Sequence, residues 1–312
     1  MEVRRRFWAR LLAVAITVTV AALGAVDVEA KQKINTTSAP AATPSQTGAG
    51  AAAAPVPILS EARDLSPLAA SVDTLIAAGG ATAGVTLIEL GGADPLSWSA
   101  NGAQVFTAAS TYKLAALMLE AENIAAGKTD PNGAVCFEPD DYESGWFDDY
   151  AVGVCFTRTE LALRAGIYSD NTAGHMLVRD VGGAAVLNAW AESIGATSSE
   201  FFEGNTTTSD DLAALWDAEA LGSLGGAAAQ AWLYPMLTNT RTESGVPAGV
   251  DGVTVVHKTG TIDLVDNDAA LVTAGPDGAY ILTVMTDSLG GAAGWQLIAA
   301  ISAAIWQFES TR

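Results

Sequence analysis

Residues 106–120 read FTAASTYKLAALMLE and contain the serine and lysine around which the rest of the chain is organised. Lys113 follows Ser110 by three residues, and the leucines and methionine after it recur at helical spacing. Residues three apart share one face of a helix, so the Lys113 amine can reach the Ser110 hydroxyl. A serine becomes a strong nucleophile when a neighbouring base takes its proton, and a desolvated lysine is neutral enough to do so. The spacing alone also fits a helix-capping serine followed by a solvated lysine.

Two further motifs follow this stretch. Residues 168–173 read YSDNTA and lie between helical patterns, whereas residues 257–261 read HKTGT and lie near the end of an alternating strand pattern. Together the three stretches give S-x-x-K, S-D-N and K-T-G in the order found in class A β-lactamases and penicillin-binding proteins. NTTTSDDLA at 205–213 is also close to the wording of that family. The chain from about Ser66 onward therefore resembles the class A β-lactamase family of active-site serine hydrolases.

The chemistry of the motif residues fits acyl transfer. Ser110 attacks a carbonyl carbon, and Lys113 takes the proton of its hydroxyl. Ser169 lies on a loop, where it can relay a proton to the leaving nitrogen. Asn171 presents an amide that can hydrogen-bond the amide of a substrate. Lys258 adds positive charge beside the nucleophile.

Further residues are expected to bind the substrate. The Thr259 hydroxyl can bind a substrate carboxylate, and Gly260 lets the substrate lie flat against the strand. The family resemblance implies an oxyanion hole formed by the backbone N–H groups of the nucleophilic serine and of Thr261. It also implies that Arg241 lies near the substrate carboxylate and that Trp146 forms an aromatic wall of the site. A solvated Arg241 and a Trp146 buried within its own loop remain the alternatives.

The chain departs from the family between its S-D-N and T-T-T motifs. Class A enzymes carry an omega loop there, with a glutamate that activates the water that removes the acyl group. Here only residues 196–205 separate Gly195 from Thr206, and the E-P-x-L-N wording of the family is absent. Glu203 is the candidate for the deacylation base, with Glu200 as the alternative. The shortened loop predicts slow deacylation after normal acylation.

The order of patterns predicts an α/β (α+β) fold. A helix and a hairpin come first, a run of helices follows, and strands and a last helix end the chain. We expect an antiparallel β-sheet flanked by the N- and C-terminal helices, with an inserted all-helical lobe and the site between them. The expected boundaries are a catalytic domain at 59–312, with a sheet lobe at 59–107 and 232–312 and a helical lobe at 108–231.

The first part of the chain has a different composition. Several arginines within residues 1–10 precede an apolar run at 11–26, which predicts a signal peptide over residues 1–30, with an uncleaved membrane anchor as the alternative. Residues 31–58 are rich in Ala, Thr, Ser, Pro and Gly and predict a flexible linker. Export favours a disulfide between Cys136 and Cys155, although two buried free thiols also fit the sequence.

Composition limits the partners. The net charge is −20, with 35 acidic and 15 basic residues. Nucleic acids and anionic membranes select basic surfaces, so neither is an expected partner, and membrane contact is expected only through an uncleaved N-terminal segment. We expect a secreted, monomeric serine hydrolase that acts on small molecules, with no metal and no cofactor. β-Lactams are the first candidate substrates. A D-alanyl-D-alanine peptidase or other amidase or esterase is the alternative, followed by a non-catalytic β-lactam-binding or sensing module.

Overall fold

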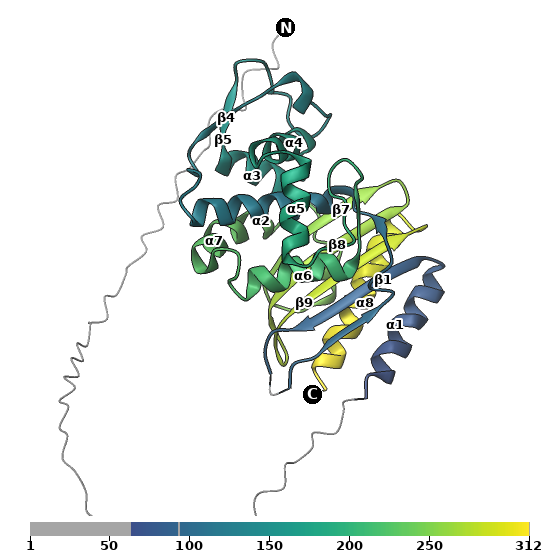
Figure 1. Cartoon of the computed structure of the whole chain (residues 1–312). Coiled ribbons are helices and arrows are strands. Elements are labelled where there is room, and N and C mark those ends of the chain that lie inside the picture. The colour runs from purple at the N-terminus through teal and green to yellow at the C-terminus, as the bar shows by residue number, and fades with distance from the viewer. Residues whose placement is uncertain (1–63, 93, 312) are drawn as a thin grey trace, which may run out of the picture. The chain divides into compact units, whose positions relative to one another are not determined.

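The structure is a computed structural model that describes residues 64–92 and 94–311 (Figure 1). The signal peptide expected at 1–30 and the linker expected at 31–58 lie outside the described residues. Among the described residues, no helix combines the length and the apolar character needed to cross a membrane.

The elements follow the order that the sequence patterns predict, and most helices lie in the middle of the chain. The helices are α1 (Ser66–Gly79), η1 (Ala109–Thr111), α2 (Tyr112–Ala125), η2 (Pro139–Asp141), α3 (Arg158–Ile167), α4 (Asn171–Asp180), α5 (Ala184–Ile194), α6 (Ser209–Ala220), α7 (Gly226–Leu233), η3 (Tyr234–Leu237), η4 (Val246–Gly249) and α8 (Ala292–Glu309), where η marks a 3₁₀ turn. The strands are β1 (Thr82–Glu89), β2 (Ser97–Ala100), β3 (Phe106–Thr107), β4 (Ala134–Cys136), β5 (Cys155–Thr157), β6 (Thr206–Thr207), β7 (Val255–Ile262), β8 (Val265–Gly275) and β9 (Gly278–Asp287).

The main sheet has five strands in the order β2-β1-β9-β8-β7, and neighbouring strands are antiparallel. The first two strands come from the start of the catalytic part and the other three from its end, so the sheet joins distant parts of the sequence. The expected antiparallel sheet with flanking terminal helices is confirmed. Because β7 lies at an edge of the sheet, one side of its backbone is available to neighbouring groups other than a strand.

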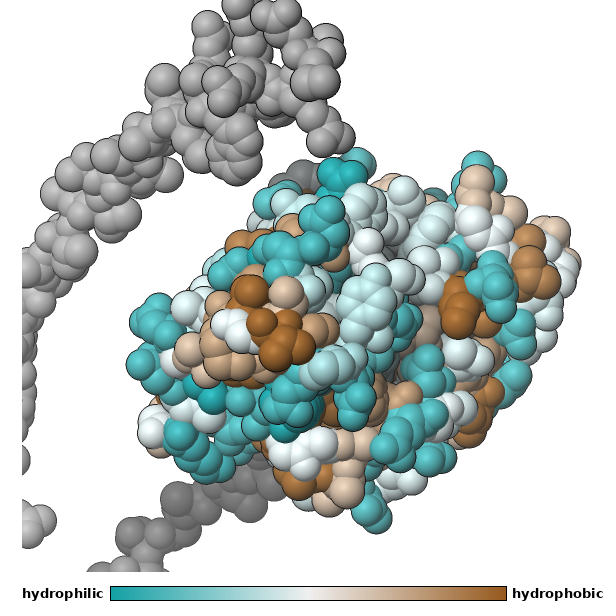
Figure 2. Space-filling model, turned by 90° about the horizontal axis from the view of Figure 1, so that it is seen from above, coloured by the Kyte–Doolittle hydropathy of each residue, from teal (hydrophilic) through white to brown (hydrophobic). Residues whose placement is uncertain are grey.

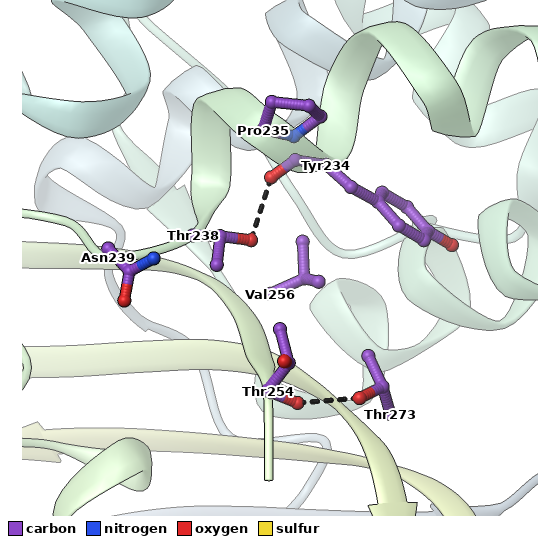
Figure 3. Close-up of a pocket in the computed structure, with 7 residues that line it drawn as sticks. All are labelled: Tyr234, Pro235, Thr238, Asn239, Thr254, Val256 and Thr273. Carbon is purple, nitrogen blue, oxygen red and sulfur yellow. Dashed lines mark hydrogen bonds between the residues drawn. The ribbon is translucent and has the colours of Figure 1, made fainter. Parts of the chain in front are cut away.

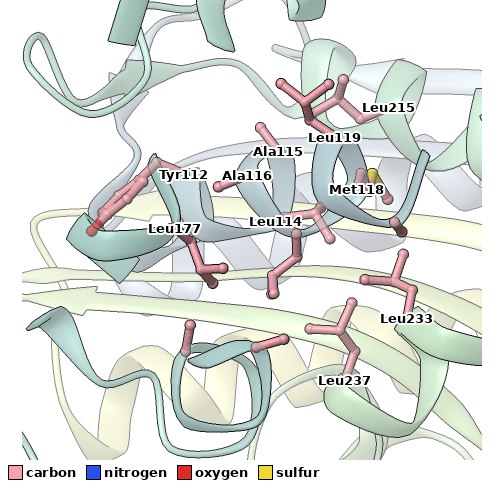
Figure 4. Packing of buried hydrophobic residues seen from close by; sticks show 14 of the residues in the cluster. Tyr112, Leu114, Ala115, Ala116, Met118, Leu119, Leu177, Leu215, Leu233 and Leu237 are labelled. Atoms are coloured by element: carbon pink, nitrogen blue, oxygen red, sulfur yellow. The ribbon is translucent and has the colours of Figure 1, made fainter. Parts of the chain in front are cut away.

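Two hydrophobic clusters stabilise the fold. One lies between the sheet and the terminal helices and contains Val72 of α1 and Ile301 of α8. The other surrounds α2, which is buried from Tyr112 to Ala121 and packs against leucines of α4, α6 and α7 (Figure 4). A helix with no exposed face along most of its length holds its first turn in a fixed place. That first turn directly follows Ser110.

α6 links the helical part to the sheet. Its N-cap Thr208 accepts a hydrogen bond from the backbone N–H of Asp211 at 3.0 Å. The next residue, Ser209, accepts at its backbone oxygen a 2.7 Å bond from the Thr283 hydroxyl of β9. The two parts of the chain are therefore packed together over a polar as well as an apolar interface.

Hydrophilic residues cover much of the one face of the molecule that Figure 2 shows. The face seen from above carries small, separate hydrophobic patches among hydrophilic residues (Figure 2). This distribution fits an acidic protein and gives no sign of a large apolar docking surface on that face.

Candidate active site

Ser110 lies in a tight turn immediately before α2. The preceding residue, Ala109, has a positive φ of 49°, which is unusual for a residue with a side chain. The Thr111 hydroxyl donates to the Ala108 carbonyl at 2.6 Å and closes the turn. Strained backbone of this kind is often held at functional sites, where the surrounding structure fixes it. The turn presents the Ser110 side chain next to the first turn of α2.

The Lys113 amine lies within hydrogen-bonding distance of the serine. Its Nζ is 2.9 Å from Ser110 Oγ, 2.8 Å from the Ser169 carbonyl oxygen and 2.7 Å from Asn171 Oδ1. The side chain is fully buried. Burial lowers the pKa of Lys113 from 10.5 to about 7, although the negative charges of Asp170 and Glu143 oppose this shift. A large share of the amine is therefore neutral near pH 7 and able to accept the proton of Ser110.

Ser169 faces the same space from the turn between α3 and α4. Its φ is 55°, so this turn, like the Ser110 turn, has left-handed backbone. The Lys258 amine of β7 donates to Ser169 Oγ at 2.9 Å and to the Thr259 carbonyl at 2.7 Å. Burial, followed by the nearby charge of Lys113, lowers the pKa of Lys258 well below its usual value. The Ser110 hydroxyl is therefore hydrogen-bonded to one buried amine, that of Lys113. The Ser169 hydroxyl is hydrogen-bonded to another, that of Lys258.

Asp170 holds the Ser169 turn in place. Its carboxylate accepts hydrogen bonds from the Trp146 backbone N–H at 2.8 Å, the Tyr150 hydroxyl at 2.7 Å and the Ala173 N–H at 3.0 Å. The last bond caps α4. Sequence reasoning treated Asp170 only as part of a motif, whereas the structure shows a buried anion that fastens a distant loop to the site.

β7 approaches the Ser110 turn at Gly260. A Cβ at this position would lie 2.7 Å from the Ala108 carbonyl oxygen, 2.9 Å from the Thr111 nitrogen and 3.0 Å from the Ser110 nitrogen. These are backbone atoms, which cannot rotate away. Glycine is therefore required for the strand to pass this close to the nucleophile, a reason that differs from the flat substrate surface expected from the sequence.

A cavity of about 250 Å³ opens in front of these groups. Its lining includes most of the side chains expected at the site from the sequence, namely Ser110, Trp146, Ser169, Asn171, Arg241, Thr259 and Thr261. The Arg241 guanidinium carbon lies 5.1 Å from the centre of the Trp146 ring. Both side chains are exposed, so Trp146 is not buried in its own loop. The cavity thus combines the Ser110 hydroxyl, further hydroxyls, an amide, a cation and an aromatic surface.

Comparison with known proteins agrees with this geometry. The model of the beta-lactamase enzyme family matches residues 67–308. The chain belongs to this family. Among solved structures it is similar to PBP-A, at 27% identity and a TM-score of 0.74 over 80% of this chain and 98% of that one. It is similar to a beta-lactamase from Sphaerobacter thermophilus, at 25% identity and a TM-score of 0.70 over 80% and 98% of the chains. A comparison with curated protein sequences finds no match.

A third similar structure is a variant of the class A beta-lactamase of the last common ancestor of Gram-negative bacteria. It is 25% identical, has a TM-score of 0.65 and covers 77% of this chain and 97% of that one. The family and the fold expected from the three motifs are therefore confirmed.

The segment at 196–205 differs from the loop that the family resemblance implies. Glu200 pairs with Thr206 in an isolated β-bridge, and its side chain lies against Gly204. Glu203 is exposed. Of the hydrogen bonds and ion pairs among residues 64–92 and 94–311, none joins Glu203 to Ser110, Lys113 or Asn171. The aromatic ring of Phe202, not a carboxylate, packs toward the site, 5.6 Å from the Tyr112 ring and 4.9 Å from the His175 ring.

His257 proves to be a buried member of an ionic group. Its Nδ1 lies 2.9 Å from Asp268 Oδ1, and its Nε2 lies 3.1 Å from Glu243 Oε1. Burial opposes protonation, but the charge of Asp268 and the bonds to both carboxylates raise the pKa of His257 to about 9. Glu243 also accepts from the Thr240 hydroxyl at 3.0 Å. The sequence suggested a sheet residue here, and the structure adds an anchor for the segment that carries Arg241.

The cysteines form the expected disulfide. Cys136 of β4 and Cys155 of β5 are paired residues of a two-stranded sheet and are bonded to each other. The disulfide closes the base of the segment 137–154, which contains Trp146.

A second hollow, of about 560 Å³, lies apart from the nucleophile beside the start of β7 (Figure 3). It is lined by Tyr234, Pro235, Thr238, Asn239, Thr254, Val256 and Thr273. Figure 3 shows two of its hydroxyls, those of Thr238 and Thr273, engaged with backbone carbonyl oxygens. None of these lining residues carries a charge, so the smaller cavity at Ser110 is the candidate active site.

Proposed function

We propose that this protein is a secreted serine hydrolase that opens β-lactams through an acyl-enzyme on Ser110 and releases the product slowly. The observation that carries the proposal is the buried Lys113 amine, 2.9 Å from Ser110 Oγ and with a pKa of about 7. Membership of the beta-lactamase enzyme family supports the substrate class. A similar protein, a point variant of PBP-A, forms an acyl-enzyme complex with penicillin G.

Acylation follows from the positions of the two amines. Neutral Lys113 takes the proton of Ser110, and Ser110 Oγ attacks the carbonyl carbon of the lactam. The negative charge that develops on the carbonyl oxygen is stabilised by backbone N–H groups of Ser110 and Thr261. Ser169 carries a proton to the leaving nitrogen, with its hydroxyl oriented by Lys258 at 2.9 Å. Arg241 and Thr259 bind the carboxylate of the substrate.

Slow release follows from the short segment at 196–205. Removal of the acyl group needs a base that activates water, and general-base assistance is worth about 10²–10⁴-fold in rate. In this chain Phe202 packs against Tyr112 and His175 from that segment. The second step therefore lacks the carboxylate that the loop supplies in class A enzymes.

A D-alanyl-D-alanine peptidase is the second candidate. It is favoured by the shortened segment and by the similarity to PBP-A. Intact Ser110, Lys113, Ser169 and Lys258 argue against a third candidate, a binding module without catalysis. Export is proposed from the arginine-rich and apolar pattern of residues 1–30.

The test is intact-mass spectrometry of the mature protein mixed with penicillin G over a time course. The proposal is supported by an adduct of one penicillin per protein molecule that lasts far longer than one catalytic cycle of a fast β-lactamase. Ser110→Ala is the matched control and should form no adduct. A persistent adduct together with cleavage of a D-alanyl-D-alanine peptide would favour the peptidase, because a similar protein, PBP-A, also forms an acyl-enzyme with penicillin G as a point variant. Rapid hydrolysis without an adduct would refute slow release.

A further inference from the structure

The segment 137–154 brings a carboxylate to the catalytic groups from a direction that the family motifs do not indicate. Glu143 is fixed through its backbone to the start of α4. Its N–H donates to the Thr172 hydroxyl at 3.1 Å, and its carbonyl accepts from the same hydroxyl at 2.7 Å. Two residues later, Gly145 passes so close to Asp170 that a Cβ would lie 2.4 Å from its carboxylate. The position of Glu143 is therefore set by contacts on both sides.

The Glu143 side chain turns toward the catalytic residues. Oε1 accepts from Asn171 Nδ2 at 2.8 Å, and Oε2 lies 2.9 Å from His175 Nε2. The other end of the same Asn171 amide accepts from the Lys113 amine at 2.7 Å. The side-chain amide of Asn171 therefore lies between Glu143 and Lys113, the proposed base for acylation. The negative charge of Glu143 also raises the pKa of Lys113 against burial, as expected for a nearby carboxylate.

The surroundings of this carboxylate suit a base. One carboxylate oxygen is held by the Asn171 amide, and the other faces the His175 ring. The side chain is 51% exposed, so water reaches its remaining lone pairs. His175 is itself held against the ring of Phe202, at 4.9 Å between ring centres. The segment 196–205, which lacks the glutamate of the family's omega loop, therefore supports His175 through Phe202. His175 in turn contacts Glu143.

We propose that Glu143 is the base that activates water for deacylation in this protein. The inference rests on the acyl-enzyme of the proposed function. It assigns to the segment 137–154 the task that the omega loop performs in class A enzymes. Because Asn171 and His175 engage both oxygens, only the remaining lone pairs of Glu143 are available to water, in accord with slow release.

The proposed step balances without any further reactant. A water hydrogen-bonded to Glu143 gives it a proton while the water oxygen attacks the ester carbon on Ser110. The tetrahedral intermediate then breaks its bond to Ser110 Oγ, and the electron pair stays on Oγ. That oxygen takes a proton from Lys113, which lies 2.9 Å away, and the proton held by Glu143 returns to Lys113 by way of solvent, so no proton is gained or lost. The product is a carboxylic acid, and Ser110 is restored.

The test separates the two halves of the reaction. The full-length mature enzyme is acylated with penicillin G, free penicillin is removed by rapid desalting, and adduct decay is followed by intact mass. The acylation rate is measured separately by stopped flow with a chromogenic cephalosporin. In Glu143→Gln, adduct decay should slow by about 10²-fold, the lower end of general-base effects, while acylation stays within about threefold. Glu143→Asp retains a carboxylate and should recover part of the decay rate.

Asp148→Asn is the matched control, because Asp148 is an exposed acid of the same segment. Both of its rates should equal those of the wild type. Adduct decay in Glu143→Gln at the wild-type rate would overturn the inference and leave the proposed function standing. An equal loss of acylation and decay would also overturn it, since Glu143 would then only orient Asn171. If the wild type forms no adduct, the proposed function and this inference both fall.

Discussion

The pH dependence of acylation gives the sharpest test of the first half-reaction. With a pKa of about 7, about three quarters of Lys113 is neutral at pH 7.5, whereas a lysine with the usual pKa of 10.5 would be neutral in about one molecule in a thousand. The acylation rate should therefore rise tenfold per pH unit well below pH 7 and level off above pH 8. Burial of the amine is the cause of this low inflection.

The two histidines near the site have pKa values that are shifted in opposite directions. The pKa of His175 is lowered from 6.5, mainly by burial, and that of His257 is raised to about 9. Burial also lowers the pKa of Lys258 well below its usual value, so an inflection near 7 is assigned to Lys113 by its loss in a Lys113 variant. Arginine at this position stays charged at all these pH values, so Lys113→Arg should lose the inflection and about 10²–10⁴-fold in acylation rate.

The assay is stopped-flow acylation by a chromogenic cephalosporin from pH 5.5 to 9.5 at constant ionic strength. Thermal unfolding at each pH serves as the control for loss of folded protein. A rate that is flat over this range, or that rises only near pH 10, would refute the assignment of Lys113 as the base. So would a Lys113→Arg variant that keeps the wild-type profile.

Three further predictions concern stability and geometry. Burial, then the charge of Glu122, raises the pKa of Glu219 from 4.5 to about 7, so its contribution to stability is present below pH 4.5 and lost as pH rises through 7. Glu219→Gln should therefore raise the free energy of unfolding at pH 8 by about 2 kcal/mol and change it little at pH 4.5, measured by urea denaturation. Replacing both cysteines by serine should lower the free energy of unfolding by about 3 kcal/mol, while Asp170 still anchors the segment 137–154 and acylation changes only a few-fold. Gly260→Ala should cost about 1–3 kcal/mol and reduce acylation at least tenfold in stopped flow, because the added Cβ meets backbone atoms of the Ser110 turn.

The fold could be predicted because its main signals are local. Alternating residues on both sides of a Gly-Pro-Asp-Gly turn are typical of a hairpin, and these residues form β8 and β9. A threonine or serine followed by aspartates is typical of a helix start, and Thr208 is the N-cap of α6. The helical spacing of Ser110 and Lys113 gave their contact before any tertiary structure was known. Each of these patterns depends on residues a few positions apart.

The remaining parts of the site depend on contacts between distant residues. Glu143 and Asn171 are 28 residues apart, and Glu143 lies in an irregular segment with no periodicity. Asp170 accepts from Trp146, and His257 pairs with Asp268 on the neighbouring strand. No spacing rule connects such pairs. The charge on Glu143 and the identity of Asp170 were visible in the sequence, but their partners required the fold.

The distinction between local motifs and contacts of distant residues also applies to acylation and deacylation, the two halves of the proposed reaction. The groups for acylation come from short motifs whose geometry is set by one helix, one turn and one edge strand. The base for deacylation comes from a loop, and loops of different length reach the same space by different paths. In this chain the segment 196–205 is short, and the ring of Phe202 from this segment contacts His175. His175 in turn holds Glu143 from the segment 137–154. On the proposed mechanism, the packing of these two segments sets the rate at which the acyl-enzyme is released, whereas the motifs set the rate at which it forms.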